Sequence, residues 1–272
     1  MPFKDLLLLI GKDTEAANRY ALALSRICGA TLTATSFEGV PSLPAFIRSE
    51  MPSDILDHMR EDAENAARTA LDAFSDTAKQ LQVPAETLVL DLTTGDMTSE
   101  ISRLARYFDA TVLQQPDPHG TDRFDAIEAV LFGSGRPVLI VPFIQVPAQL
   151  RTILIAWDEG RPAARAAADA LPLLGMAERV EVVTIGTVRG DQTRPTDHLV
   201  RHLAQHGIEA HMTSLVSDRG SVASTLLTHA ADVKADLIVM GGYGHSRLRE
   251  MVLGGTTRTM LQTMTVPVLM AH

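Results

Sequence analysis

The alternation of apolar and polar positions is nearly the same in two long stretches of the chain. The first begins at Asp5 and reads DLLLLIGKDTEAANRYALALSRICGATLTATSF; the second begins at Thr152 and reads TILIAWDEGRPAARAAADALPLLGMAERVEVVTIG. Each stretch predicts an apolar strand, a short polar turn, an alanine-rich amphipathic helix and a second strand. The pattern therefore indicates two copies of one structural unit.

Shorter matches later in each copy support the repeat. DATVLQQPDPHG at Asp109 matches ADLIVMGGYGHS at Ala235, and RPVLIVP at Arg136 matches TVPVLMAH at Thr265. The proline-punctuated segment VPFIQVPAQLR between the copies is typical of a linker. We therefore predict two domains, residues 1–147 and residues 148–272.

Strands and helices alternate throughout the second copy. The predicted strands are Thr152–Trp157, Val180–Ile185, Glu209–Val216, Asp236–Met240 and Pro267–Ala271. The predicted helices are Pro162–Leu174, Thr196–His206, Ser221–Val233 and Leu248–Thr263. Short apolar strands separated by helices predict a parallel sheet covered on both faces. The predicted fold class is therefore α/β, with two tandem, doubly wound, five-stranded parallel-sheet domains. Ligands of such sheets bind beyond the carboxyl ends of the strands.

The first copy is longer than the second by about twenty residues, within EGVPSLPAFIRSEMPSDILDHMRE after its second strand. The prolines, followed by Ser53 and Asp54, predict a loop that leads into a longer helix. Two interpretations stay open. A tolerated surface insertion is favoured, and the alternative is a flap or interface over the cleft.

Composition and charge narrow the function classes. Of the 272 residues, 46% are apolar and 4% aromatic, so we expect aliphatic core layers rather than an aromatic-lined pocket. The formal net charge of −9 argues against nucleic-acid or anionic-membrane partners, which need a concentrated positive surface. Cys28 is the only cysteine, so no internal disulfide is expected. The chain opens without a signal-peptide pattern, and its Leu6–Gly11 run is too short to span a bilayer. We expect a soluble cytoplasmic protein.

Glycines surround a basic segment after the fourth predicted strand of the second copy. They are Gly241, Gly242, Gly244, Gly254 and Gly255. Glycine lets the backbone approach a ligand closely, and successive N–H groups before a helix favour anionic oxygens. The common phosphate-binding motifs do not fit. The chain has no G-x-x-x-x-G-K-[ST], and GYGHSR has Arg247 where the third glycine of a dinucleotide fingerprint belongs.

The spacing of Gly241, Gly244 and Gly254 resembles Gly-x2-Gly-x9-Gly-[Ser/Thr], the signature of the universal stress protein family. The whole second copy resembles this family, and the first copy resembles it more weakly, so the chain looks like a tandem member. The family's five-stranded α/β fold, similar to that of the adenine nucleotide alpha hydrolases, agrees with the predicted order of elements.

The resemblance implies where ATP, with Mg²⁺, would bind. Family members that bind ATP place an Asp after the first strand against the nucleoside, a position that Asp158 matches, and their backbone contact to adenine maps onto Ile185. The family has a hydroxyl after the last glycine. Here Gly255 holds that place, so Thr256 or Thr257 would reach a phosphate from a different angle. The candidate nucleotide-binding residues are Asp158, Ile185, Met240, Gly241, Gly244, His245, Gly254, Gly255, Thr256 and Thr257.

The first copy lacks these features. Gly11 replaces the Asp, and QPDPHGTDRFDAIEAVLFGSGRP replaces the glycine loop. Pro116 and Pro118 cannot donate backbone N–H groups, and Asp117 would repel phosphate. The GSG sequence at residues 133–135 predicts a turn. We interpret this copy as degenerate and structural.

Other candidate chemistry is weaker. His198, His202 and His206 share a helical face, where two of them could bind a metal. Leu199 and Leu203 mark the neighbouring buried stripe, so a solvated helix face is the favoured interpretation. A base, a nucleophile and an oxyanion site do not occur together in the sequence. We therefore assign no catalytic residue and no metal site, and we expect no efficient catalysis.

These features predict a universal-stress-type protein with a non-catalytic role in a stress response and ATP as a regulatory ligand of its second domain. As the resemblance implies, the two domains would pack as an internal pseudo-dimer and pair again into a homodimer. Two alternatives stay open: a slow ATPase or phosphotransfer enzyme that uses the same loop, and a protein-interaction module whose nucleotide site is a relic. The role of His245 is open too, since it either contacts phosphate or points to water.

Overall fold

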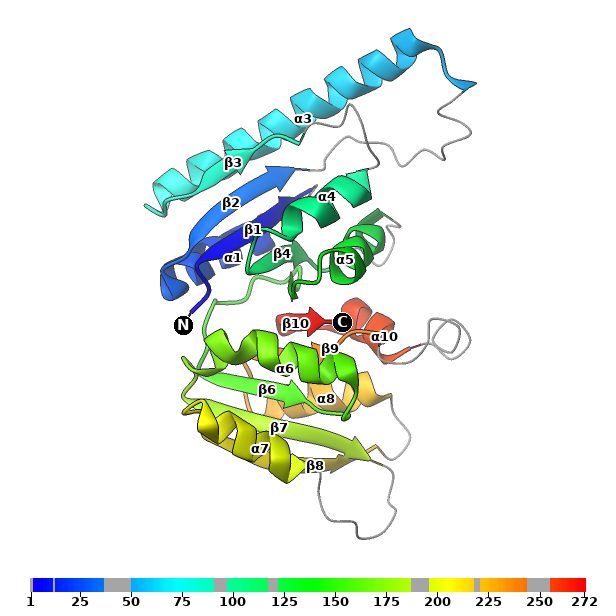
Figure 1. Ribbon diagram of the computed structural model, residues 1–272. Coiled ribbons are helices and arrows are strands. Elements are labelled where there is room, and N and C mark those ends of the chain that lie inside the picture. Colours follow the sequence, from blue (N-terminus) through cyan, green and yellow to red (C-terminus); the bar gives the residue numbers. More distant parts are fainter. Residues whose placement is uncertain are drawn as a thin grey trace.

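The computed structural model describes residues 2–11, 13–36, 50–90, 97–116, 122–186, 196–217, 221–243 and 255–272. Its strands form one ten-stranded sheet with the order β3-β2-β1-β4-β5-β10-β9-β6-β7-β8 (Figure 1). Strands β1 to β5 belong to the first half of the chain, and strands β6 to β10 belong to the second half.

The two halves have the same order of strands. The first half contains β1 (Asp5–Ile10), α1 (Glu15–Cys28), β2 (Thr31–Ser36), α3 (Ser53–Gln80), β3 (Glu86–Leu88), α4 (Met97–Ala105), β4 (Ala110–Gln114), α5 (Asp122–Gly133) and β5 (Val138–Val141). The second half contains β6 (Thr152–Ala156), α6 (Arg161–Leu174), β7 (Arg179–Gly186), α7 (Thr196–Gln205), β8 (Ala210–Val216), α8 (Val222–Asp232), β9 (Leu237–Gly241), α10 (Thr256–Thr263) and β10 (Val268–Ala271). Within each half all paired strands are parallel. The predicted α/β class, with two five-stranded parallel units, is confirmed.

The two units meet at the centre of the sheet, where β5 and β10 pair antiparallel with Leu139 opposite Leu269. Both strands are buried along their whole length. The halves therefore share one continuous sheet instead of forming two separate ones. The domain boundary predicted at residue 147 lies between β5 and β6 and stays a prediction.

Helices cover both faces of this sheet. Buried residues of α1, α3, α6 and α7 pack on one face, and buried residues of α4, α5, α8 and α10 pack on the other (Figure 1). Successive side chains of a strand point to opposite faces, so Leu6 and Leu8 of β1 enter the first core while Leu7 and Leu9 enter the second. A strand buried on both faces needs a continuous apolar run, which explains the sequence LLLLI.

One polar contact shows how closely the second half repeats the first. Asp109 Oδ2 accepts hydrogen bonds from the N–H groups of residues 4 and 5, at 2.7 and 3.1 Å. Asp236 Oδ2 accepts the equivalent bonds from residues 151 and 152, at 2.9 and 3.0 Å. Each Asp precedes the fourth strand of its unit and holds the start of the first strand. This register places Gln114 and Gly241 at equivalent positions.

The predicted elements of the second half agree with the observed ones to within one residue at each end, except for the last helix. A helix was expected over Leu248–Thr263, but α10 begins at Thr256. Gly255 precedes it with an extended backbone, φ −55° and ψ 145°, which a continuous helix does not allow. Residues 248–254 lie outside the described part of the chain.

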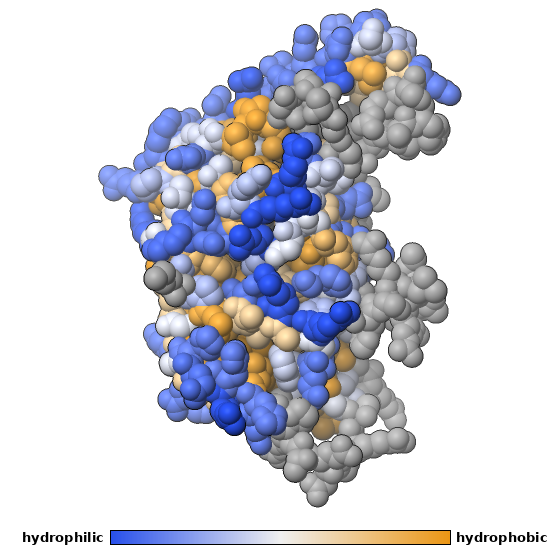
Figure 2. Space-filling model, in the orientation of Figure 1, coloured by the Kyte–Doolittle hydropathy of each residue, from blue (hydrophilic) through white to orange (hydrophobic). Residues whose placement is uncertain are grey.

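The extra residues of the first half lead into α3, which confirms the longer helix. Its buried residues begin at Ala63, and the turns before that residue are mostly exposed. Figure 2 shows mainly hydrophilic side chains on the visible surface of α3. The choice between a surface insertion and a flap stays open, and residues 37–49 lie outside the described part. Among the described residues, no helix combines the length and apolar character needed to cross a membrane.

Candidate functional site

The second half has its topological switch point at β6, which lies between β7 and β9. After β6 the chain turns into α6 through a short polar segment. Asp158 is exposed, and its Oδ1 accepts a hydrogen bond from Gly160 N–H at 2.8 Å. Glu159 takes a left-handed backbone, with φ +63°. Asp158 thus organises the turn with one carboxylate oxygen, and its Oδ2 takes no part in that bond.

Gly241, the last residue of β9, is packed closely against the first turn of α6. A Cβ atom at this position would lie 2.5 Å from Ala163 N and 2.8 Å from Pro162 Cβ. Because glycine has no Cβ, the helix can approach the strand this closely. The amino end of α6, which carries the positive end of the helix dipole, is therefore held beside the carboxyl end of β9. This packing role was not visible in the sequence.

The backbone of Ile185 points toward the space beyond β6. The last residue of β7 that pairs with β6 is Val183, whose carbonyl accepts the Trp157 N–H at 2.9 Å. Peptide groups of a strand point alternately to its two neighbours, so the N–H and C=O of Ile185 point to the same side as those of Val183. On the other side, Gly186 O accepts Ser217 N–H at 3.4 Å. Ile185 therefore directs a donor and an acceptor to the side on which β6 has already ended.

Two amides at the start of the glycine loop are engaged within the protein. Gly242 N–H donates to Ala271 O at 2.9 Å, and Tyr243 N–H donates to Thr257 Oγ1 at 3.1 Å. These groups cannot bind a phosphate unless these hydrogen bonds break. The candidates Gly244, His245 and Gly254 lie outside the described part of the chain.

The remaining candidates differ in accessibility. Met240 is 6% exposed and packs in the core beneath α8 and α10, so its side chain serves packing. Thr257 is 3% exposed, and its hydroxyl accepts the Tyr243 N–H. Thr256 is half-buried at the first position of α10, directly after Gly255. Of the two threonine hydroxyls, that of Thr256 is the better placed to reach a ligand.

In the first half, Gln114 occupies the position equivalent to Gly241. Its Nε2 donates to Asp13 O at 2.6 Å, and its Oε1 accepts from Ala17 N–H at 3.4 Å. The side chain is buried. It therefore fills the space between β4 and the amino end of α1 and engages a helix amide there. The first half thus places a side chain between strand and helix where the second half has Gly241 packed directly against α6.

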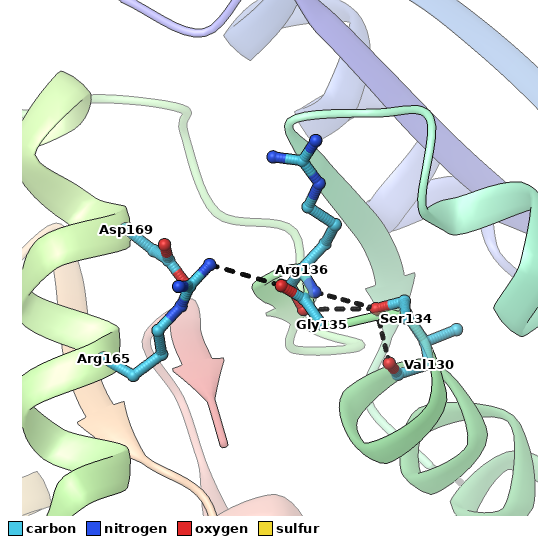
Figure 3. A network of polar contacts seen from close by, with 6 residues as sticks. All are labelled: Val130, Ser134, Gly135, Arg136, Arg165 and Asp169. Carbon is cyan, nitrogen blue, oxygen red and sulfur yellow. Dashed lines mark hydrogen bonds and ion pairs between the residues drawn. The ribbon is translucent and has the colours of Figure 1, made fainter.

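The GSG sequence at the end of α5 forms a turn, as predicted. Ser134 Oγ donates to Val130 O at 2.6 Å and accepts from Arg136 N–H at 3.0 Å, and Gly135 has φ +72° (Figure 3). The carbonyl of Gly135 accepts a hydrogen bond from Arg165 Nη2 of α6 at 3.3 Å. This turn is therefore also a contact between the two halves.

The solvated-face interpretation is confirmed, because His198 and His202 of α7 and His206 just after it are exposed, while Leu199 and Leu203 are buried. The rings of His202 and His206 meet edge to face, with 4.8 Å between their centroids. Within the described ranges, no three His, Cys, Asp or Glu side chains are grouped so that they could hold a metal ion.

The fold is that of a doubly wound α/β protein built from two five-stranded parallel units. The model of the universal stress protein family matches residues 149–272, so the second half of the chain is similar to members of that family. Universal stress protein Slr1230 from Synechocystis sp. is 29% identical over 92 residues, which are 33% of this chain and 31% of that protein. The match thus spans about a third of the length of this curated relative.

A solved structure resembles the whole chain. The crystal structure of a universal stress protein from Archaeoglobus fulgidus DSM 4304 is 20% identical and has a TM-score of 0.72. The alignment covers 97% of this chain and 94% of that one. The first half, which the family model does not match, is therefore included in a shared fold.

Proposed function

We propose that the second half binds an adenine nucleotide at the carboxyl ends of β6, β7 and β9, and that the protein acts in a stress response as a non-catalytic binding protein. The observation that carries this proposal is the convergence of three features from different elements at one edge of the sheet. They are the carboxylate of Asp158, the outward backbone of Ile185 and the amino end of α6 beside Gly241.

Each feature suits a different part of the ligand. Adenine has a donor and acceptors on its edge, which the C=O and N–H of Ile185 can pair with. The second carboxylate oxygen of Asp158 can accept a hydrogen bond from a ribose hydroxyl, as acidic residues do in other doubly wound folds. The helix dipole of α6 favours the negative charge of the phosphates. Mg²⁺, which is held mainly by phosphate oxygens and water in such sites, would accompany ATP.

The same reasoning assigns the first half a structural role. Gln114 already accepts a hydrogen bond from an amide at the amino end of α1, and Gly11 stands where the second half has Asp158. We therefore expect one nucleotide for each chain.

The test is to detect the nucleotide directly. Mass spectrometry of the denatured, purified protein should show retained ATP, ADP or AMP. Trp157 is the only tryptophan and immediately precedes Asp158, so its fluorescence should change saturably when ATP and Mg²⁺ are added to nucleotide-free protein, with GTP as the control. A protein that carries no nucleotide and shows neither a fluorescence change nor a thermal shift with ATP would overturn the proposal.

The same preparation distinguishes binding from catalysis. We expect ATP to remain intact during long incubation with the protein and Mg²⁺. Sustained phosphate release above a protein-free control would favour the ATPase alternative instead.

A further inference from the structure

One stripe of α5, a helix of the first half, contacts the second half. Phe124, Glu128 and Phe132 are spaced by four residues and therefore share a helical face. The guanidinium carbon of Arg258 in α10 lies 5.3 Å from the centre of the Phe124 ring. Tyr243 OH donates to Glu128 Oε1 at 2.8 Å.

The third member of the stripe completes the contact. The Phe132 ring lies 5.1 Å from the Tyr243 ring and 4.7 Å from the ring of His272, between centroids. His272 Nδ1 is 3.0 Å from Gly242 O. Gly242 and Tyr243 come directly before residue 244, so α5 holds the backbone that leads into the glycine loop.

Tyr243 itself is held in a sparsely populated conformation. Its φ is +53°, which is uncommon for a bulky residue and persists where surrounding contacts enforce it. Those contacts come from both halves: Thr257 Oγ1 accepts a hydrogen bond from the Tyr243 N–H, and Glu128 Oε1 accepts one from the Tyr243 hydroxyl. Arg258, the neighbour of Thr257, contacts α5 as well. The stripe therefore holds residues just before and just after residues 244–254.

The first half differs at the residue equivalent to Tyr243. Pro116 follows Gln115 in the first half, at the position equivalent to Tyr243. Proline has neither a hydroxyl nor an N–H group, so it cannot make the two hydrogen bonds that fix Tyr243. Among the described residues, α5 thus fixes Tyr243 of the second half, and the first half has no such pair of hydrogen bonds at Pro116.

We propose that the α5 stripe is a positioning element for the nucleotide site of the second half, so that nucleotide binding and the contact between Glu128 and Tyr243 are energetically coupled. This inference rests on the proposed nucleotide binding. Its physical basis is reciprocity: if the contact favours the arrangement of Gly242 and Tyr243 that binds nucleotide, the bound nucleotide must strengthen the contact by the same factor. The first half then regulates the site without touching the ligand.

The first experiment measures the dissociation constant for ATP by the fluorescence of Trp157. Tyr243→Phe and Glu128→Ala each remove the hydrogen bond and should weaken ATP binding by about five- to tenfold. Glu128→Gln retains an acceptor oxygen and should bind within about twofold of the wild type. Asp72→Ala, which removes an exposed carboxylate from α3, is the matched control and should leave binding unchanged.

The second experiment separates positioning from a contribution to folding alone. In the wild type, ATP should slow amide hydrogen exchange in α5, and this protection should be lost in Tyr243→Phe. Adding Tyr243→Phe to Glu128→Ala should cause no further loss of affinity, because both changes remove one contact. The exchange measurement on the wild type needs no variant, so it decides the question even if a variant folds poorly.

The outcomes distinguish the two proposals. If the wild type binds ATP but the variants bind equally well and α5 gains no protection, the coupling is refuted and nucleotide binding stands. If the wild type does not bind ATP, both proposals fail.

Discussion

The buried Glu181 in β7 pairs with the half-buried His229 in α8, with His229 Nε2 2.7 Å from Glu181 Oε1. Glu181 is 1% exposed, and Arg179 Nη2 donates to its other oxygen at 2.8 Å. Burial by itself would raise the pKa of Glu181. The net effect is a lowered pKa, because hydrogen bonds from Thr213 and His229 and the positive charges of His229 and Arg179 outweigh burial. A buried charge is tolerated here because it is fully partnered.

The lowered pKa predicts a specific dependence of stability on pH. The folded protein holds Glu181 ionised at a pH where the unfolded chain would protonate it, so the pair stabilises the fold above the ordinary pKa of 4.5. This contribution should be lost as the pH falls below that value and through the folded pKa. Urea unfolding at several pH values should show it as a falling midpoint. Glu181→Gln should flatten the acid limb of this curve, whereas Glu209→Gln, at an exposed position, should not.

Gly241→Ala should destabilise the protein by roughly 1–3 kcal/mol, because the new methyl group would overlap the backbone of α6. Gly186→Ala is the matched control at the same edge of the sheet. A Cβ there would meet no atom of the described residues within 4 Å, so its effect should be small. Thermal and urea unfolding of the two variants measure the difference. Equal stabilities would contradict the packing role of Gly241.

Gln114→Ala should cost about 1–3 kcal/mol, since it leaves Asp13 O and Ala17 N–H without their buried partner. Gln80→Ala, on the exposed end of α3, should have little effect. Chemical denaturation measures both. An unchanged stability for Gln114→Ala would show that water replaces the side chain at no cost. The two hydrogen bonds of Gln114 would then not stabilise the first half.

Much of the fold could be predicted from periodicity. Runs such as LLLLI fit a strand buried on both faces, and the alanine-rich helices fit a period of 3.6 residues. The antiparallel pairing of β5 with β10 could not be predicted, because an apolar run indicates burial but not the neighbouring strand. The predicted start of the last helix, at Leu248, was wrong. The sequence pattern favours a helix on both sides of Gly255, but the backbone of Gly255 itself is extended.

The candidate site was less accessible to sequence reasoning. The family resemblance placed Asp158 and Ile185, and the structure puts both at the same edge of the sheet. The packing role of Gly241 and the contacts of the Gln114 side chain both depend on the distance between a helix and a strand. A single sequence does not reveal that distance. Glu128 and Tyr243 are separated by 115 residues, and no local pattern connects them.

The two roles of Asp158 can be separated with one conservative change. Asp158→Asn retains an Oδ1 that can accept the Gly160 N–H, so the turn into α6 should survive and the unfolding midpoint should stay close to that of the wild type. Asp158→Asn also removes the negative charge of the side chain. Because hydrogen bonds to charged groups are stronger than those between neutral groups, ATP binding should weaken by about tenfold. Asp158→Ala should lose both the turn and the binding. Titrations of Trp157 fluorescence and thermal unfolding of the two variants measure affinity and stability separately. If Asp158→Asn binds ATP as well as the wild type does, Asp158 serves only the turn, and the nucleoside is held by other groups.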